Sequence, residues 1–124
     1  MLGAAIRSIL LADSTVSGLV GTRIYPFELP LNSSFPALTY SIISDPYQIV
    51  LRSARLQVSC WAADYTERET LKDAVETALK FYTGLSEGKN IEIIWPIGPY
   101  DHIKDEQSGF FFIPIDFKVN YYTS

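Results

Sequence analysis

The sequence has few of the side chains that carry out most enzyme chemistry. Its 124 residues include one cysteine, Cys60, and one histidine, His102. A lone cysteine forms no intrachain disulfide, which excludes a disulfide-stapled secreted scaffold. Any Ser–His or Cys–His pair would have to use His102. Cys60 falls at an apolar position of an alternating segment, which favours an inert buried thiol over a nucleophile. We therefore expect no Ser–His or Cys–His nucleophile and no cofactor.

The sequence also lacks a run of charge of one sign and a long apolar run. Ten Lys and Arg against fourteen Asp and Glu give a net charge of −4, and the basic residues are scattered from Arg7 to Lys118. Proteins that hold nucleic acid by its phosphates need a clustered basic face, so we expect no sequence-specific nucleic-acid binding. No apolar stretch reaches the roughly 20 residues of a membrane span, and Arg7 follows the apolar start instead of preceding it as in a signal peptide. Residues 1–124 are expected to form one soluble domain in a reducing compartment, with no membrane contact.

Hydrophobic spacing predicts two helices. Apolar residues recur at helical intervals over 2–11, and a shorter helical turn is expected over 14–20. Thr66 and Glu69 match a capping box at the start of a second helix, whose apolar period continues to Tyr82 before Gly84 ends it.

Segments rich in β-branched and aromatic residues predict the strands, over 23–27, 37–44, 54–61, 91–95 and 110–122. Pro26 restricts the first to a sheet edge, Pro96 is expected to end the fourth, and Pro114 indicates an edge or a bulge in the last. Short connections between neighbouring strands favour an α+β fold: a mostly antiparallel sheet of about four to five strands with two helices packed on one face.

One polar segment has metal-ligand chemistry. If it were helical, Asp101 and Asp105, or His102 and Glu106, would share a side at i,i+4 spacing. The segment lies between Pro99 and Gly109, where a solvated loop is the simpler interpretation, so we expect no metal.

The segment 45–53 is more informative, because it joins two strands and yet carries Tyr47, Ile49, Val50 and Leu51. Hairpin loops are ordinarily polar. One interpretation is a longer hairpin whose residues cover the sheet. The other is an apolar arm that packs on a neighbouring subunit, since exposed apolar loops mark contacts. Both remain open from the sequence.

The order of these segments resembles the tail-completion proteins of long-tailed bacteriophages. After an N-terminal helix come Val16-Ser-Gly-Leu-Val-Gly-Thr-Arg-Ile-Tyr-Pro26 and Phe35-Pro-Ala-Leu-Thr-Tyr40. Arg55-Leu-Gln-Val-Ser-Cys-Trp61, the helix from Thr66 and a last strand with Asp116-Phe117 continue the likeness. It covers nearly the whole chain, although the loops 45–53 and 99–109 match least.

The resemblance implies a non-enzymatic virion protein, made in the host bacterial cytoplasm, that forms a ring at the head-proximal end of the tail tube. Such a ring, commonly a hexamer, terminates the tube and joins the tail to the head connector while DNA passes through. The expected partners are other copies of the chain, the tail-tube protein and the head-connector protein. We assign the subunit interface to Tyr47, Ile49, Leu51 and Arg52, with Arg52 as an ion-pair partner. The contact with the tube or connector is assigned to Tyr100, Asp101 and His102.

Other functions remain open from the sequence. The chain could be another protein of the phage neck, such as a head-completion or connector-stopper protein. It could be an oligomeric adaptor of a prophage-derived or gene-transfer particle. From a different class, it could be a small ligand-binding or catalytic α+β domain whose site includes His102.

Overall fold

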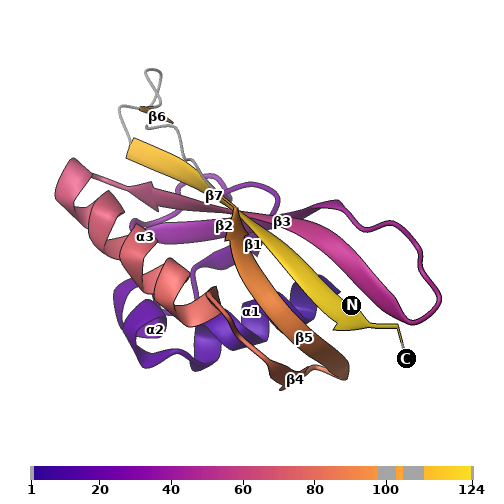
Figure 1. The fold of residues 1–124 in the computed structure, drawn as a ribbon. Coiled ribbons are helices and arrows are strands. Elements are labelled where there is room, and N and C mark those ends of the chain that lie inside the picture. The colour runs from indigo at the N-terminus through magenta and orange to yellow at the C-terminus, as the bar shows by residue number, and fades with distance from the viewer. Residues whose placement is uncertain (1, 98–102, 105–110, 124) are drawn as a thin grey trace.

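The computed structural model describes residues 2–97, 103–104 and 111–123. Three helices lie on one face of a mixed sheet (Figure 1). The helices are α1 (Leu2–Ala12), α2 (Ser14–Val20) and α3 (Tyr65–Leu79). The strands are β1 (Ile24–Pro26), β2 (Ala37–Ser44), β3 (Leu51–Ala62), β4 (Gly84–Ser86), β5 (Lys89–Ile97), β6 (Ile103–Lys104) and β7 (Phe111–Tyr122).

The sheet has the strand order β1-β2-β3-β7-β5-β4, and β6 pairs with β7. The β1–β2 pair is parallel and the other pairs are antiparallel. β1 and β4 end this order, yet α1 packs against both β2 and β4. The sheet therefore curls around α1, which brings its two ends toward the same helix.

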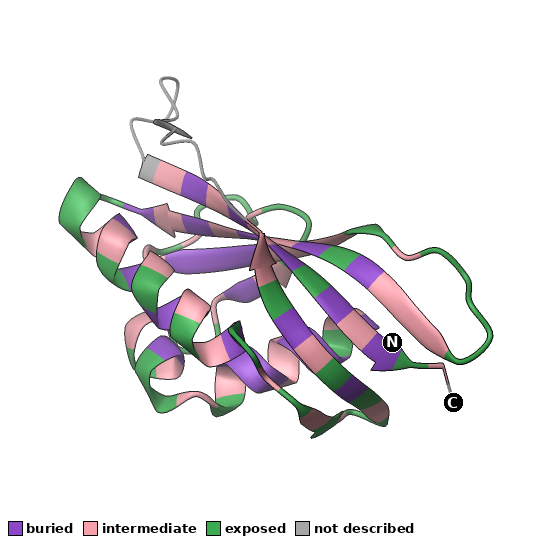
Figure 2. Cartoon of the chain, viewed as in Figure 1, coloured by how far each residue is buried: buried purple, intermediate pink, exposed green. Residues whose placement is uncertain are grey.

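The core lies between the helices and the concave face of the sheet. β3 and β7 pair from Leu51 opposite Tyr122 to Ala62 opposite Phe111, and their alternate residues are buried (Figure 2). The inward residues of these two strands are Ala54, Leu56, Val58, Cys60, Ala62, Ile113, Ile115, Phe117, Val119 and Tyr121. Complete burial of an aliphatic or aromatic side chain is worth about 1.5–3 kcal/mol, so this double row is a main source of stability.

The first two helices are separated by a cap. α1 ends at Ala12, and the side chain of Asp13 accepts hydrogen bonds at 3.0 Å from the amides of Thr15 and Val16. This capping starts α2 in a new direction, and the two axes differ by 91°. The fold class is thus α+β as predicted, but with three helices in place of two, because the expected turn over 14–20 is a helix of its own.

The third helix differs from the prediction at both ends. Asp64 is its N-cap and accepts from the Glu67 amide at 2.7 Å, so the cap lies two residues before the expected Thr66. The helix ends at Leu79 and does not reach Tyr82. Phe81 adopts φ of +61°, its amide donates to the Ile94 carbonyl at 2.7 Å, and the Ile94 amide donates to the Tyr82 carbonyl at 3.2 Å. Bonding to β5 therefore replaces the last helical turn.

The described residues form seven strands, whereas about four to five were predicted. β4 and β6 were missed, and β6 falls within the polar segment 99–109 that was predicted to be a loop. β3 begins at Leu51, three residues before the predicted start, and β5 continues through Pro96. β4 pairs with β5 only over Lys89–Ile91. Beside Pro96, on the β4 side of β5, no strand lies within the described residues. The amide hydrogen that proline lacks is therefore not needed for a hydrogen bond between strands there.

The other two prolines agree with the prediction. Pro26 ends the edge strand β1. Pro114 lies opposite Ser59 of β3, and on its other side it falls between the β5 pairing, which ends at Asp116, and the β6 pairing, which begins at Phe112. Pro114 is therefore at a local gap in the ladder.

Candidate functional site

The connection between β2 and β3 projects beyond the sheet as an apolar arm, defined here as residues 45–50 (Figures 1 and 2). The exposed fractions of Tyr47, Ile49 and Val50 are 75%, 82% and 66%. The hairpin is longer than predicted, because β3 begins at Leu51, but these three side chains face solvent and do not cover the sheet. Exposed apolar clusters of this kind are typical of contact surfaces.

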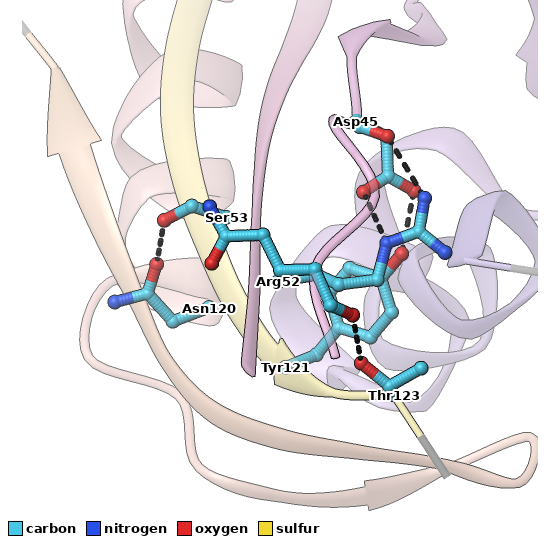
Figure 3. Close-up of polar contacts among 7 residues, drawn as sticks. Asp45, Arg52, Ser53, Asn120, Tyr121 and Thr123 are labelled. Carbon is cyan, nitrogen blue, oxygen red and sulfur yellow. Dashed lines mark hydrogen bonds and ion pairs between the residues drawn. The ribbon is translucent and has the colours of Figure 1, made fainter. Parts of the chain in front are cut away.

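The base of the arm is held by a polar cluster (Figure 3). Arg52 Nε lies 3.2 Å from Asp45 Oδ1, and Arg52 Nη2 donates to the Asp45 carbonyl at 2.8 Å. The Tyr121 hydroxyl donates to the other carboxylate oxygen of Asp45. The Arg52 guanidinium also lies 5.7 Å from the ring centroids of Tyr47 and Tyr121. Asp45 and Arg52 thus fix both ends of the arm to each other and to β7.

The residue after β7 holds the outer part of the arm. The Thr123 amide donates to the Val50 carbonyl, and the Thr123 hydroxyl donates to the Gln48 carbonyl, both at 2.9 Å. With these bonds added to the Asp45 cluster, the arm presents its apolar side chains from a fixed backbone. Such preorganisation reduces the entropy that is lost on binding.

Tyr121 joins this cluster to the core. The side chain is buried, and burial together with the hydrogen bond to the Asp45 carboxylate raises the pKa of its phenol to about 12. Both effects favour the neutral phenol, because a phenolate would be desolvated and would face a second negative charge.

Two of the four predicted interface residues, Tyr47 and Ile49, project from the arm. Leu51 is half-buried at the start of β3, opposite Tyr122. Arg52 pairs with Asp45 of its own chain. The predicted tube or connector contact, Tyr100, Asp101 and His102, lies outside the described residues, as do Asp105 and Glu106 of the acidic segment.

A groove beside α1 was not predicted from the sequence. It has a volume of about 480 Å³ and lies against the first turns of α1. Its walls are Gly3, Ala4, Arg7 and Ser8 of α1, Pro26 and Phe27 at the end of β1, Tyr40, Ser41 and Ile42 of β2, and Glu87 of the β4–β5 turn. Phe27 is 79% exposed at its rim. Four separate segments form the groove, so no local pattern reveals it; the small residues Gly3 and Ala4 on one side of α1 are its one sequence signal.

The described residues show no arrangement for catalysis. Cys60 is fully buried, and burial raises the pKa of its thiol well above the usual range, which leaves it protonated and inert. No group of three or more His, Cys, Asp or Glu able to hold a metal occurs within the described residues. In that same part of the chain no single helix has the length and apolar character to cross a membrane; α1 and α2 together do, but they are bent by 91°.

A comparison with models of protein families identifies the family of this chain. The family model for tail completion protein gp17 matches residues 4–95, which is more than half of the chain. The chain belongs to the tail completion protein gp17 family. The resemblance drawn from the sequence is thereby confirmed. The family is one of structural phage tail proteins and not a class of enzymes.

Among solved structures, the tail completion fold is similar to a chain described as "Virion of native gene transfer agent (GTA) particle". The two are 18% identical, the alignment covers 98% of this chain and 94% of the other, and the TM-score is 0.74. At this identity the likeness shows the shared fold. No curated protein sequence matches the chain significantly.

Proposed function

We propose that this tail completion protein forms a ring at the head-proximal end of a phage tail tube, where it terminates the tube and joins the tail to the head connector. The family match over residues 4–95 carries this proposal. The similar chain in the gene transfer agent virion supports it, because that particle is a virion and the alignment covers nearly all of both chains. The protein's place is then the virion, and its partners are further copies of itself, the tube protein and the connector protein.

A ring of more than two subunits that uses one kind of contact requires two different, complementary patches on each subunit, because a self-complementary patch is satisfied by a single pair of subunits. The arm supplies one such patch, with Tyr47 and Ile49 as exposed apolar anchors and Leu51 and Arg52 at its base. The proposed ring encloses a lumen through which DNA passes. The net charge of −4 suits that path, since a strongly basic lumen would retain DNA instead of letting it slide.

The contact with the tube or connector is proposed for Tyr100, Asp101 and His102. If it is correct, the double substitution Tyr100→Ala/His102→Ala lowers head–tail joining while the isolated protein unfolds at the same denaturant concentration as wild type. Unchanged joining would move this contact to another surface.

The deciding experiment is electron microscopy of lysates from a phage or phage-like particle with a stop codon in this gene. DNA-filled heads separate from tails, especially tails of abnormal length, are the expected result. Joined heads and tails of normal length would overturn the proposal. Tails of normal length that carry no neck, beside leaking heads, would instead indicate a head-completion or stopper protein.

A further inference from the structure

The groove beside α1 is bounded by two regions of the sheet that have no further strand next to them. β1 pairs with β2 only from Leu38 to Tyr40, so the outer side of β2 is open from Ser41 to Ser44 within the described residues. β4 is the opposite end of the strand order, and the Ser86 hydroxyl next to Glu87 donates to the Ala5 carbonyl of α1 at 2.9 Å. The groove thus occupies the interval between the two ends of the curled sheet, with α1 as one of its walls.

The charged groups of the groove are already engaged within the chain. Arg7 Nε donates to the Ile24 carbonyl at 3.0 Å, and Arg7 Nη2 donates to the Thr22 carbonyl at 3.4 Å. The Ser8 hydroxyl donates to Glu87 Oε1 at 2.9 Å. The walls are otherwise Phe27, Tyr40, Ile42 and small residues, which suit an apolar occupant. Glu87, exposed at the rim, has a carboxylate that can accept one further hydrogen bond.

The arm is complementary to the groove, because the side chains that it projects are mostly apolar. The carboxylate of Asp45 forms an ion pair with Arg52 and accepts a hydrogen bond from Tyr121. The part of the arm that projects therefore presents no unpaired charge. Tyr47 and Ile49 supply apolar side chains, and the Tyr47 phenol is a hydrogen-bond donor of the kind that the Glu87 rim accepts. Within one chain the arm does not cover the groove, because Tyr47, Ile49 and the groove residue Phe27 are all largely exposed.

We propose that the arm of one copy seats in the groove beside α1 of the neighbouring copy. Tyr47 and Ile49 enter between Phe27, Tyr40 and Ile42, and the Tyr47 hydroxyl donates to Glu87. This inference rests on the proposed ring and names the contact that builds it.

A second copy is the occupant that best matches these two surfaces. Each chain carries the arm and the groove as different patches, so in the proposed ring the contact is heterologous and is repeated from copy to copy until the ring closes. Every arm then has a groove and every groove an arm, which covers both apolar surfaces at once. A small molecule in the groove would leave the arm exposed.

Cysteine cross-linking in assembled particles tests this contact. Cys60 is fully buried, so the natural chain supplies no competing thiol, and both Ala4 on the groove wall and Ile49 on the arm are exposed. The variant Ala4→Cys/Ile49→Cys, treated with a short bis-maleimide, is expected to give a ladder of covalent oligomers. The control Thr70→Cys/Ile49→Cys, with its first cysteine at an exposed position of α3, is expected to stay monomeric.

The outcomes separate this contact from the ring itself. Joined particles in which Ala4→Cys/Ile49→Cys remains monomeric, or links only within one chain, overturn the arm-in-groove contact and leave the proposed function standing. If the stop-codon particles are joined normally, the proposed function fails instead.

A second variant covers the case in which the cysteine pair itself disturbs assembly. Ala4→Trp fills the groove from an exposed helical position and leaves the core unchanged. We expect it to lower the yield of joined particles at least tenfold, whereas Thr70→Trp stays at the wild-type yield. Equal yields of joined particles from the two tryptophan variants would overturn the contact.

Discussion

Arg52 and Asp45 form an ion pair at the base of the arm. Arg52 Nε lies 3.2 Å from Asp45 Oδ1, and Arg52 Nη2 donates to the Asp45 carbonyl at 2.8 Å. Each side chain is 23% exposed. The pair is therefore partly shielded from water, and it joins the first residue of the arm to the start of β3, just after the arm ends.

Replacing Arg52 with methionine should loosen the arm. The substitution leaves the half-buried Asp45 carboxylate without its cation, and we expect a loss of about 1–2 kcal/mol in the free energy of unfolding, measured with urea. Arg55→Met is the matched control, because Arg55 is 53% exposed in its pair with Asp116 and an exposed pair is worth roughly 0–1 kcal/mol. Equal losses from the two variants would show that the Asp45 pair does not stabilise the arm.

The ionisation of Tyr121 should lower the free energy of unfolding at alkaline pH. The folded-state pKa of about 12 lies above the ordinary value near 10, so from about pH 10 to 12 the unfolded chain gives up this proton while the folded chain keeps it. The stabilisation is complete below about pH 10 and is lost as the pH rises toward 12. We expect Tyr121→Phe to flatten this fall in the free energy of unfolding, and parallel curves for the two proteins would contradict it.

The thiol of Cys60 should be unreactive in the folded protein. Because it is fully buried and its pKa is raised, a disulfide reagent added to native protein should release no coloured thiolate, whereas protein in guanidinium chloride should release one equivalent per chain. Cys60→Ser should cost about 1–3 kcal/mol through the buried hydroxyl. Cys60→Ala, which adds no polar atom, is the control and should cost less; rapid native labelling would contradict the burial.

Thr39 should stabilise the folded protein through a single hydrogen bond. The Trp61 indole N–H donates to the Thr39 hydroxyl at 3.0 Å, and the Trp61 ring stacks on Phe112 with centroids 4.6 Å apart. Thr39→Val keeps the shape but leaves the indole N–H without its acceptor, which should cost about 1–2 kcal/mol. Thr70→Val, at an exposed position of α3, should cost much less, and tryptophan fluorescence follows both unfolding transitions.

The strands that form the core were predictable because their signal is local. Every second residue is apolar in β3 from Ala54 onward and in β7, and burial follows that alternation. β4 and β6 have three and two residues, too few to show a period. Their pairing is decided by β5 and β7, which lie beside them in space.

The ends of α3 show a different limit of local reasoning. Thr66 and Glu69 match the capping pattern, but so do Asp64 and Glu67, and the chain uses the second pair. At the other end, the apolar period continues to Tyr82, but backbone bonding of Phe81 and Tyr82 with Ile94 ends the helix at Leu79. The helical spacing of apolar residues cannot predict that a strand later in the sequence will bond with these residues and end the helix.

The candidate site was predictable in the same uneven way. The apolar arm was visible as a run of side chains that a hairpin loop rarely carries, whereas its base needed Tyr121 and Thr123 from the far end of the chain. The groove needed α1, β2 and the turn at Glu87 to meet. Contacts between remote segments become evident only once the strand order is known.

The place of β7 in the strand order has a consequence for synthesis on the ribosome. β7 lies between β3 and β5, so among the described strands it is the one that links β1-β2-β3 to β5-β4, although it follows all of them in sequence. Until residues 111–122 have been synthesised, the strand that joins the two parts of the sheet is absent from the nascent chain. A chain that stops before Phe111 also lacks the Tyr121 and Thr123 contacts to the arm. We therefore expect a chain truncated before Phe111 neither to complete the sheet nor to fix the arm.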